Sequence, residues 1–464
     1  CWEHYDLGLL DDWDSKAEQF CVPGGAAVGN VQPSSLTCRV MNDAHLPAAT
    51  RPHTACDGEF IAVDFAKLTP TKCPQFRRGY KCDGPPIFYR YGPGALEVCG
   101  ACRRTTNFRD TSFPRDHLRD IFHSWSDVQS VSSMASVPTA DAPVTLFLTR
   151  ERLEHANLFH STTDFLNAFE ALHMAKVINV HREGDRTGMA NVQAVVLDEQ
   201  GEGPFDDVFK RVFSPNYPVL RVSGIKSTAK KKLLFPKAVF SPPGYTNMLF
   251  THLDTMGDCR ERLQLLESFR MFVLNGLGIP PPKPRQQGGF VRCRGAAGGA
   301  CVDARTPPVR IVFISRKPYN KFVNHGFVGR QVSNEPDVLA ALNSIPDVSA
   351  ELVDFVHLTF EEQLRMVANT DVMVGMHGAA LSHAVYMPPW GGVIELWPKN
   401  KDMWRCFEHL SEMAGLVYRR WENLESSAFH KDSKGDYTRV NIPAFSGIAK
   451  SVVEQVVARR ATSK

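Results

Sequence analysis

The sequence lacks any run of about 18 or more consecutive apolar residues, and this excludes a membrane-spanning helix within its 464 residues. It also has no Asn-x-Ser/Thr tripeptide, so it gives no sign that the protein itself carries N-linked glycans. The formal net charge is only +3, which gives no reason to expect a nucleic-acid partner. Hydrophobic residues make up 43% of the chain and charged residues 22%, as in globular proteins of two or three domains.

Only one Cys-x-x-Cys pair occurs, from Cys99 to Cys102, so a zinc site built from two such pairs is excluded. The 12 cysteines are concentrated near the start of the chain, where eight of them precede residue 103. This pattern favours disulfides formed in an oxidising compartment, with another kind of zinc site or free thiols as alternatives, and it leaves the connectivity open. The eight are Cys1, Cys21, Cys38, Cys56, Cys73, Cys82, Cys99 and Cys102.

Residues 1–140 are rich in Gly, Pro, Asp and Ser and contain few periodic apolar runs. We therefore expect an irregular, disulfide-stapled layer that wraps the first domain, with one short strand at residues 60–65. Asp12-Trp13-Asp14 is the only Asp-x-Asp tripeptide of the chain. Metal-dependent sugar-nucleotide enzymes often place such a motif after a buried strand. Here it lies in a polar stretch, and we interpret it as surface sequence.

Residues 279–308 form the clearest linker, because they are rich in Pro and Gly and lack a regular apolar pattern. They separate a first domain at residues 141–278 from a second at residues 309–444. In the second domain, short apolar runs alternate with helical patterns, which predicts a doubly wound parallel sheet. Residues 445–464 contain a last helix, which we expect to cross back to the first domain. The expected strands are 144–148, 192–197, 309–314, 351–356, 372–376 and 393–397, and the expected helices of the second domain are 337–344, 360–368 and 403–413.

Residues 371–395 carry the most informative local pattern. An apolar strand is followed by His377, by the small residues 378–380 and by a helix, and a second strand then carries Glu395. The helix N-terminus would present unpaired N–H groups at the carboxyl end of the sheet, and the small residues would let a phosphate approach them. Glu395 can accept hydrogen bonds from a ribose diol. The alternative is a tight turn in a βαβ core that binds no ligand.

Ser315, Arg316 and Lys317 directly follow another expected strand, so their side chains project at its carboxyl end. A phosphate group bound at this edge would need cationic and N–H donors. Arg316 suits this role because a planar guanidinium can bind phosphate through two hydrogen bonds. The alternative is an arginine that only pairs with a nearby acid.

A polar stripe follows the expected strand at residues 144–148. Glu154, Asn157, His160 and Asp164 recur at spacings that place them on one face of a helix. The stripe contains no Lys or Arg, although an ordinary solvated face remains the alternative. His160 and Asp164 lie one turn apart and can touch, so Asp164 can act as a general base or orient His160 as one, with Glu154 as a third candidate.

The pattern Gly-x-His-Gly-Ala-x-Leu-x-His at residues 375–383 resembles the signature of glycosyltransferase family 61, with Ala380 in place of the usual Gly. We interpret His383 in this pattern as a structural residue of the helix. The run Asn-Leu-x-His-x-x-x-Asp at residues 157–164 is similar to the matching helix of the family. Stretches that resemble the β-1,2-xylosyltransferase branch lie at residues 152–160, 240–245 and 332–335.

This resemblance implies an α/β fold of the GT-B type, with two Rossmann-like domains facing a cleft and, here, a disulfide-rich N-terminal extension. It implies an inverting, metal-independent transferase that needs no cofactor besides its UDP-sugar donor. The candidates for donor binding are Arg316, His377, Gly378, Ala379, Ala380, Glu395, Ser333 and Asn334. The catalytic candidates are Asp164, His160 and Glu154, and Asn157 is the candidate for acceptor binding.

The branch that the chain resembles implies transfer of xylose from UDP-xylose to O2 of the core β-mannose of N-glycans on glycoproteins, in the Golgi lumen. One alternative is a protein O-linked GlcNAc transferase that uses UDP-GlcNAc. Another, of a different class, is a non-catalytic glycan-binding protein on a transferase scaffold. The sequence starts at Cys1 without Met, so we expect the anchor of a type II membrane protein to precede it.

Overall fold

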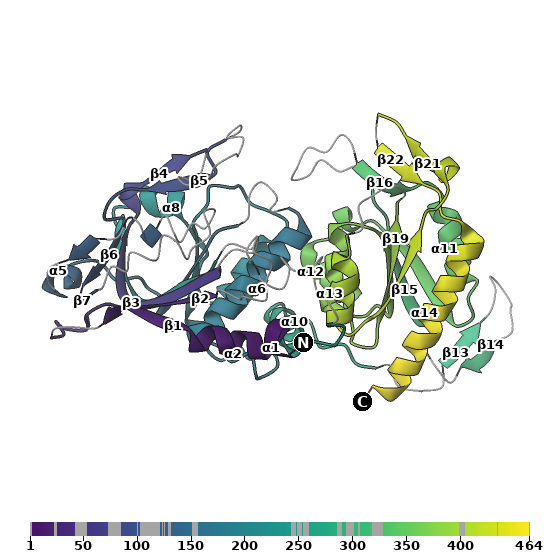
Figure 1. Ribbon diagram of the computed structural model, residues 1–464, viewed down its shortest axis with the longest axis horizontal. Helices are drawn as coiled ribbons and strands as arrows, with labels where there is room; N and C mark the ends of the chain where they lie inside the picture. Colours follow the sequence, from purple (N-terminus) through teal and green to yellow (C-terminus); the bar gives the residue numbers. More distant parts are fainter. Residues whose placement is uncertain are drawn as a thin grey trace. The chain divides into compact units, whose positions relative to one another are not determined.

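Two separate sheets organise the chain, and the computed structural model divides into two units, which are described one at a time (Figure 1). Unit 1 comprises Cys1–His252 and Glu267–Leu277, and unit 2 comprises Leu253–Leu266 and Gly278–Lys464. Among the residues that the structure describes, no helix combines the length and apolar composition needed to cross a bilayer. These residues are 2–22, 26–41, 53–72, 85–99, 101–102, 121–122, 124, 126–128, 131–150, 156–242, 247, 253, 259–284, 290–293, 301–304, 307–317, 328–398, 404–433 and 435–463.

Unit 1 is built on one mixed sheet with the strand order β11-β10-β9-β12-β3-β2-β1-β7. Strands β9 to β12 are parallel and, counted along the chain, lie in the order 3-2-1-4, which is the order of a dinucleotide-binding half-domain. Beyond β12 the pairing becomes antiparallel. The strands are β1 (Ala17–Val22), β2 (Ser35–Met41), β3 (His53–Asp64), β7 (Ala101–Cys102), β9 (Val144–Leu148), β10 (Val192–Val196), β11 (Leu220–Arg221) and β12 (Lys232–Phe240).

The N-terminal stretch differs from the irregular layer that we expected, because β1, β2 and β3 extend the sheet of unit 1. Only β3 contains a continuous apolar run, at residues 60–63, where we expected a short strand at residues 60–65. β1 and β2 carry no such run, because an antiparallel sheet can leave one face to polar residues. Cys38 and Cys56 face each other in β2 and β3 and form a disulfide. Cys21 takes part in a disulfide, and so does Cys259. Disulfide formation is therefore confirmed for these cysteines, whereas Cys99 is a buried free thiol.

The Asp-x-Asp tripeptide lies in α2 (Leu7–Ser15). We expected it on the surface, but its central residue is buried. Trp13 is 2% exposed, and its indole N–H donates to the backbone oxygen of Arg39 over 3.0 Å. The Asp14 carboxylate accepts a hydrogen bond from Arg39 Nε at 2.6 Å. The tripeptide thus attaches α2 to strand β2.

The helix predicted after β9 is α6 (Leu158–Met174), and its apolar face packs as the sequence pattern predicted. Phe165 lies 5.2 Å from Phe209, and Phe169 lies 5.0 Å from Phe272, measured between ring centroids. These partners belong to η4 (Phe209–Phe213) and α10 (Gln264–Gly276). This aromatic layer fixes α6, and with it the polar stripe that the sequence places on the same helix.

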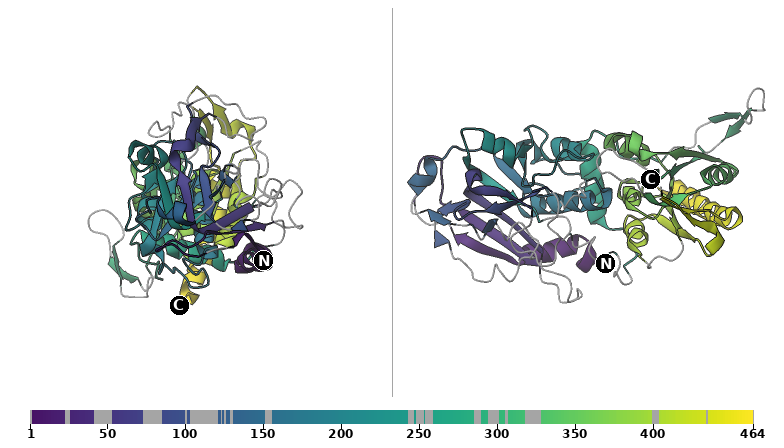
Figure 2. Two further views of the ribbon diagram at one scale, coloured as in Figure 1. Left: turned by 90° about the vertical axis from the view of Figure 1, so that its left-hand side faces the viewer. Right: turned by 90° about the horizontal axis from the view of Figure 1, so that it is seen from above.

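Unit 2 contains a five-stranded parallel sheet in the order β17-β15-β18-β19-β20, as the alternating pattern predicted. Helices α11 and α14 cover one face of this sheet, and α12 and α13 lie on the other (Figures 1 and 2). The elements are β15 (Val309–Ile314), β17 (Val348–Val353), β18 (Val372–Met376), β19 (Gly392–Trp397), β20 (Val417–Glu422), α11 (Glu335–Asn343), α12 (Phe360–Val367), α13 (Cys406–Met413) and α14 (Ile442–Thr462).

Two further segments of unit 2 differ from the sequence-based expectations. The Pro- and Gly-rich linker contains a hairpin of β13 (Phe290–Cys293) and β14 (Cys301–Ala304). The last helix, α14, belongs to unit 2, and its buried residues join the core of that unit. A small second sheet is formed by β16 (Val328–Val332), β21 (Phe429–Lys431) and β22 (Gly435–Thr438).

A buried ion pair attaches α14 to the start of β18. The Arg460 guanidinium donates to the Asp371 carboxylate at 3.1 Å and to the backbone oxygen of Pro307 at 2.8 Å. Asp371 is 1% exposed and also accepts hydrogen bonds from the Trp390 indole and from the backbone N–H of Arg310. Removing the arginine would leave a buried carboxylate without its cation.

We therefore expect Arg460→Leu to lower the free energy of unfolding by about 3 kcal/mol. The neighbouring Arg459 is exposed, so Arg459→Leu is the matched control and should cost less than about 1 kcal/mol. Urea unfolding of both variants beside the unmodified protein measures the difference. Equal losses in the two variants would show that the buried pair is not the source of stability.

Candidate functional site

The sheet of unit 2 has one position where the strand order reverses. Counted along the chain, its strands lie in the order 2-1-3-4-5, so the reversal falls between β15 and β18. In open α/β sheets, ligands bind in the crevice outside the carboxyl ends of the strands at this point. Arg316 follows β15, and His377 and Gly378 follow β18, so the fold brings these predicted donor residues to that edge.

Gly378 and Arg316 are in close contact at this edge. A Cβ atom added to Gly378 would lie 2.4 Å from Nη1 of Arg316, so a side chain there would displace the guanidinium. The guanidinium is also held from the other side, because Nε donates to the backbone oxygen of Gly329 over 2.8 Å. The glycine therefore allows the arginine to lie against the backbone of the turn.

The helix that follows is a 3₁₀ helix, η7 (Ala379–Tyr386). The first N–H groups of a helix have no acceptor within the helix, and here they lie at the carboxyl edge of the sheet. Ala379 and Ala380 are only half-buried. Ala380 does not have a positive φ, so an alanine is accommodated where the family signature has glycine.

His377 and Glu395 form a buried pair rather than two separate ligand contacts. His377 Nδ1 lies 2.5 Å from Glu395 Oε1, and the Tyr418 hydroxyl donates to Oε2 over 2.5 Å. Glu395 is 1% exposed, and both of its oxygens are used by the protein. The Glu395 carboxylate therefore orients His377, and its contact with a ribose stays a prediction.

Two physical effects act on Tyr418. Burial disfavours its charged form, and the neighbouring Glu395 carboxylate disfavours it further, so the pKa of Tyr418 is raised well above its ordinary value. The hydroxyl therefore remains a hydrogen-bond donor to Glu395 at physiological pH. His377, which is 4% exposed, is enclosed by aromatic rings at centroid distances of 4.3 Å (Trp397), 5.1 Å (Phe407) and 6.0 Å (Trp404).

Sequence reasoning missed Glu335, which fixes the segment around Arg316. Its carboxylate accepts from Ser315 Oγ at 2.8 Å and from Lys317 Nζ at 2.6 Å. The residue is 6% exposed and opens α11. Its place in the stretch at residues 332–335 that resembles the family was the available signal.

Ser333 and Asn334, predicted to bind the donor, have different surroundings. Ser333 is exposed. Asn334 is 5% exposed, and its amide makes two hydrogen bonds with the backbone of Val440, at 2.8 and 3.1 Å. Asn334 therefore holds α11 to the segment before α14.

A second guanidinium, that of Arg330, was not a candidate from the sequence. Burial lowers its pKa, while the carboxylates of Asp436 and Glu395 act in the opposite direction. His383 is buried and keeps the structural role that we expected, because burial lowers its pKa to about 4 and leaves it neutral. Its ring nitrogens lie 2.8 Å from the backbone oxygen of Ala380 and 3.0 Å from Gln363 Oε1.

Two residues of the predicted polar stripe, His160 and Asp164, lie on α6 in unit 1, and this helix begins four positions after Glu154, the first residue of the stripe. Asn157 is the N-cap of α6, and its side-chain oxygen accepts a hydrogen bond from the N–H of Phe159 at 3.0 Å. This structural role accounts for an asparagine at this position, and its contact with the acceptor substrate stays a prediction. His160 is half-buried and Asp164 is 6% exposed, one turn further along the helix. Glu154 lies outside the described residues.

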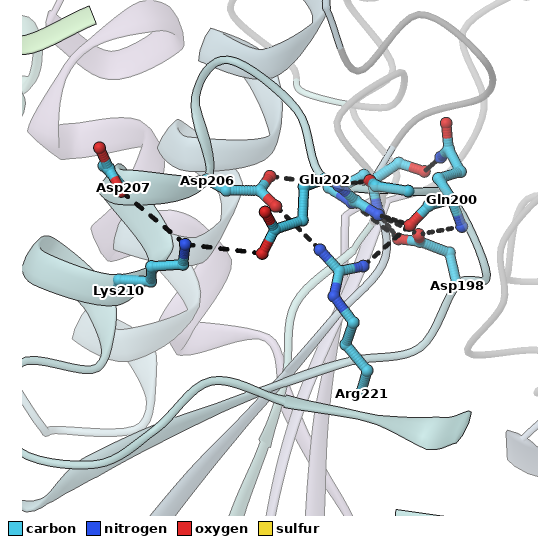
Figure 3. A network of polar contacts seen from close by, with 9 residues as sticks. Asp198, Gln200, Glu202, Asp206, Asp207, Lys210 and Arg221 are labelled. Atoms are coloured by element: carbon cyan, nitrogen blue, oxygen red, sulfur yellow. Dashed lines mark hydrogen bonds and ion pairs between the residues drawn. The ribbon is translucent and has the colours of Figure 1, made fainter. Parts of the chain in front are cut away.

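A buried ionic network at the carboxyl ends of β9, β10 and β11 was also missed (Figure 3). Arg150 is 2% exposed and donates to Asp198 at 2.7 Å and to Asp206 at 3.2 Å. Asp206 accepts a further bond from Arg221 at 2.8 Å. Burial alone would lower the pKa of Arg150, but Asp198, Asp206 and Asp164 together raise it. The charge of Asp164 thus acts on this network.

The polar stripe continues beyond the residues that the sequence singled out. Asn167 donates from Nδ2 to the backbone oxygen of Pro242 at 3.1 Å and accepts from Asn247 at 2.6 Å. Glu170 accepts from the same Asn247 amide at 3.4 Å. Both residues follow Asp164 at helical spacing, so extending the pattern by one and two turns would have found them. Burial raises the pKa of Glu170 to about 8.

Comparison with a family model and with curated proteins points to glycosyltransferases. The family model described as Glycosyltransferase 61 matches residues 158–394, which include α6 and the turn after β18. The EGF domain-specific O-linked N-acetylglucosamine transferase of Drosophila melanogaster is 28% identical over 274 residues, covering 58% of this chain and 44% of that protein. Its counterpart in Canis lupus familiaris is 24% identical over 369 residues, covering 77% of this chain and 60% of that protein. The chain thus spans about half the length of the curated relatives it matches.

The buried Glu170 carboxyl makes stability depend on pH. Its pKa is about 8 in the folded protein against an ordinary value of 4.5, so the folded chain binds more protons between these values and stability falls as pH rises through them. From about pH 5 to about pH 9 we expect a loss on the order of 3 kcal/mol in wild type, which Glu170→Gln removes. Glu183 is exposed, so Glu183→Gln is the control. Urea unfolding at both pH values provides the test. We expect Glu183→Gln to lose stability with pH as wild type does, and the same loss in Glu170→Gln would contradict the prediction.

Proposed function

Because this chain belongs to glycosyltransferase family 61, we propose that it transfers a sugar from a UDP-sugar bound by unit 2 to a hydroxyl group on a protein acceptor. The observation that carries the proposal is the contact between Arg316 and Gly378 at the strand-order reversal of a parallel sheet. At this point the guanidinium and the first N–H groups of η7 would both reach a diphosphate.

Each residue at this edge then has a role in the departure of UDP. Arg316 neutralises the charge that develops on the leaving diphosphate, and the amides of Ala379 and Ala380 add hydrogen bonds. His377 holds the turn in place through its bond to Glu395 and is a positioning residue. Glu335 does the same for the segment that carries Arg316, through Ser315. No metal is needed for this distribution of charge.

For the donor sugar we favour N-acetylglucosamine. The relatives from Drosophila melanogaster, Canis lupus familiaris and Rattus norvegicus are all named EGF domain-specific O-linked N-acetylglucosamine transferases. The support is a likeness of 24–28% identity over 58–77% of this chain. We therefore place the protein O-linked GlcNAc reading, with UDP-GlcNAc as donor, ahead of the N-glycan β-1,2-xylosyltransferase that the motifs first implied.

Xylose transfer to N-glycans remains the second candidate. The observation that favours it is the resemblance of residues 152–160, 240–245 and 332–335 to the xylosyltransferase branch. Both candidates place the reaction in the lumen of the secretory pathway, and we propose the Golgi. The disulfide between Cys38 and Cys56 supports an oxidising compartment.

For the base that takes the proton from the attacking hydroxyl we propose Asp164, with His160 as the alternative. Asp164 is 6% exposed on α6, and its charge acts on the buried Arg150. A carboxylate can accept a proton as the new glycosidic bond forms. Glu154 remains a third candidate by sequence.

Donor binding tests the proposed function directly. We expect wild type to bind UDP-GlcNAc more tightly than UDP-xylose in isothermal titration with EDTA present, and Arg316→Ala to weaken binding by about 10- to 100-fold, as for the loss of a hydrogen bond to a charged group. Gly378→Ala should weaken it similarly by displacing the guanidinium. The adjacent Lys317 is exposed and already paired with Glu335, so Lys317→Ala is the matched control and should have a smaller effect.

Each outcome of this titration has a definite meaning. Tighter binding of UDP-xylose would favour the second candidate, and an N-glycan acceptor would then be assayed. Equal losses in Lys317→Ala and Arg316→Ala would contradict a specific phosphate contact. Absence of binding for either donor would leave the third reading, a glycan-binding protein on a transferase scaffold.

The proposed base makes a separate prediction. Asp164→Asn should lower kcat by about 100-fold or more while donor affinity stays within about twofold, because the amide keeps the shape of the side chain but cannot take a proton. His160→Gln provides the comparison within the same helix turn. Transfer to an EGF-like acceptor measures kcat, and a parallel loss of donor affinity in Asp164→Asn would argue for a structural role instead.

A further inference from the structure

Three side chains that can bind a metal ion meet at the C-terminal end of α6, in unit 1. They are Asp11 of α2, His173 in the last turn of α6, and His181 in the segment that follows. One ligand atom from each lies within 4.8 Å of the other two. Asp11 Oδ1 and His181 Nε2 are 3.2 Å apart.

These separations are close to those of a metal site. Ligand atoms about 2.0–2.2 Å from a tetrahedral zinc ion lie roughly 3.3–3.6 Å from one another. The Asp11–His181 distance is already near this range, and the third atom would need to move by about 1 Å. Asp11 and His181 are 47% and 41% exposed, so their side chains can make this adjustment, whereas His173 is buried.

The buried imidazole is also oriented as a metal ligand would be. His173 Nδ1 lies 3.4 Å from the backbone oxygen of Ile178, which leaves Nε2 as the coordinating atom. Histidines that bind metals usually donate their second N–H to a carbonyl or carboxylate in this way. The His173 and His181 rings lie 5.6 Å apart, edge to face. An ordinary surface ion pair between Asp11 and His181 would not require this third group.

The surroundings bring α2 to this place without help from a metal. Asp14 of α2 pairs with Lys176, which follows α6, and with Arg39 of β2. Lys176 and Arg39 therefore pair with Asp14, whereas the Asp11 carboxylate lies beside the two imidazoles. Two neutral nitrogens and one carboxylate form a donor set that suits zinc better than magnesium or calcium, which prefer oxygen ligands.

We propose that Asp11, His173 and His181 bind one zinc ion, with water in the fourth position, and that the ion clamps α2 onto the end of α6. The site shares no residue with the proposed transfer chemistry. His160 precedes His173 by 13 positions on the same helix, which corresponds to about 20 Å along its axis. The ion therefore acts on the stability of unit 1, and donor binding by unit 2 tests a different claim.

Zinc titration of the chelator-stripped full chain tests the proposal. We expect one ion per chain with a micromolar or tighter dissociation constant, and a melting temperature about 5 °C higher at a hundredfold excess over that constant. His181→Ala should weaken binding by about 10- to 100-fold, and Asp11→Asn should also weaken it. The same zinc affinity in wild type and His181→Ala would overturn the site, as would absence of binding to wild type.

The matched control is His357→Ala in unit 2. His357 is also exposed and lies 3.7 Å from a carboxylate, that of Asp354, but it belongs to no group of three metal-ligating side chains among the described residues. We expect it to bind zinc like wild type. Circular dichroism of each variant without zinc shows whether the fold is kept, so a lost site is distinguished from an unfolded protein. A loss of affinity in the control as large as in His181→Ala would also overturn the assignment.

Discussion

Parallel strands cannot be joined by short turns, and this constraint determines which residues meet at one edge of the unit 2 sheet. Each connection must cross over the sheet, so all carboxyl ends meet at one edge. Where the order reverses, between β15 and β18, the connections lead away to opposite faces of the sheet. The segments that follow these two strands carry Arg316 and Gly378 to this edge.

The residues at this edge separate into two layers. The outer layer, formed by Arg316 and the start of η7, is the part that we propose to contact the donor. The inner layer consists of buried carboxylates, such as Glu395 and Glu335, whose two oxygens each have a partner within the protein. A buried carboxylate is costly unless it is hydrogen-bonded, and these contacts offset that cost.

Sequence patterns predicted the parallel strands well and the contacts between them poorly. The bounds of β9, β15 and β18 match the expected ranges, because a strand buried on both faces is a continuous apolar run. The antiparallel strands β1 and β2 have no such run, and the disulfide between β2 and β3 became visible only with the pairing. The role of Glu395 depended on Tyr418 of the next strand, and that of Asn157 on where α6 begins. Register and helix starts are set by tertiary packing, which a single sequence does not display.

The position of α14 has a consequence for the order in which the chain folds during synthesis. Unit 1 needs no residue beyond 277, so it can close while the rest of the chain is still being made. Unit 2 buries Asp371 early in its sheet, but the cation that balances it arrives only with Arg460. Until α14 packs on unit 2, the buried Asp371 lacks its cation and the apolar sheet face that α14 covers stays open, which makes this interval the one in which a chaperone has most to protect.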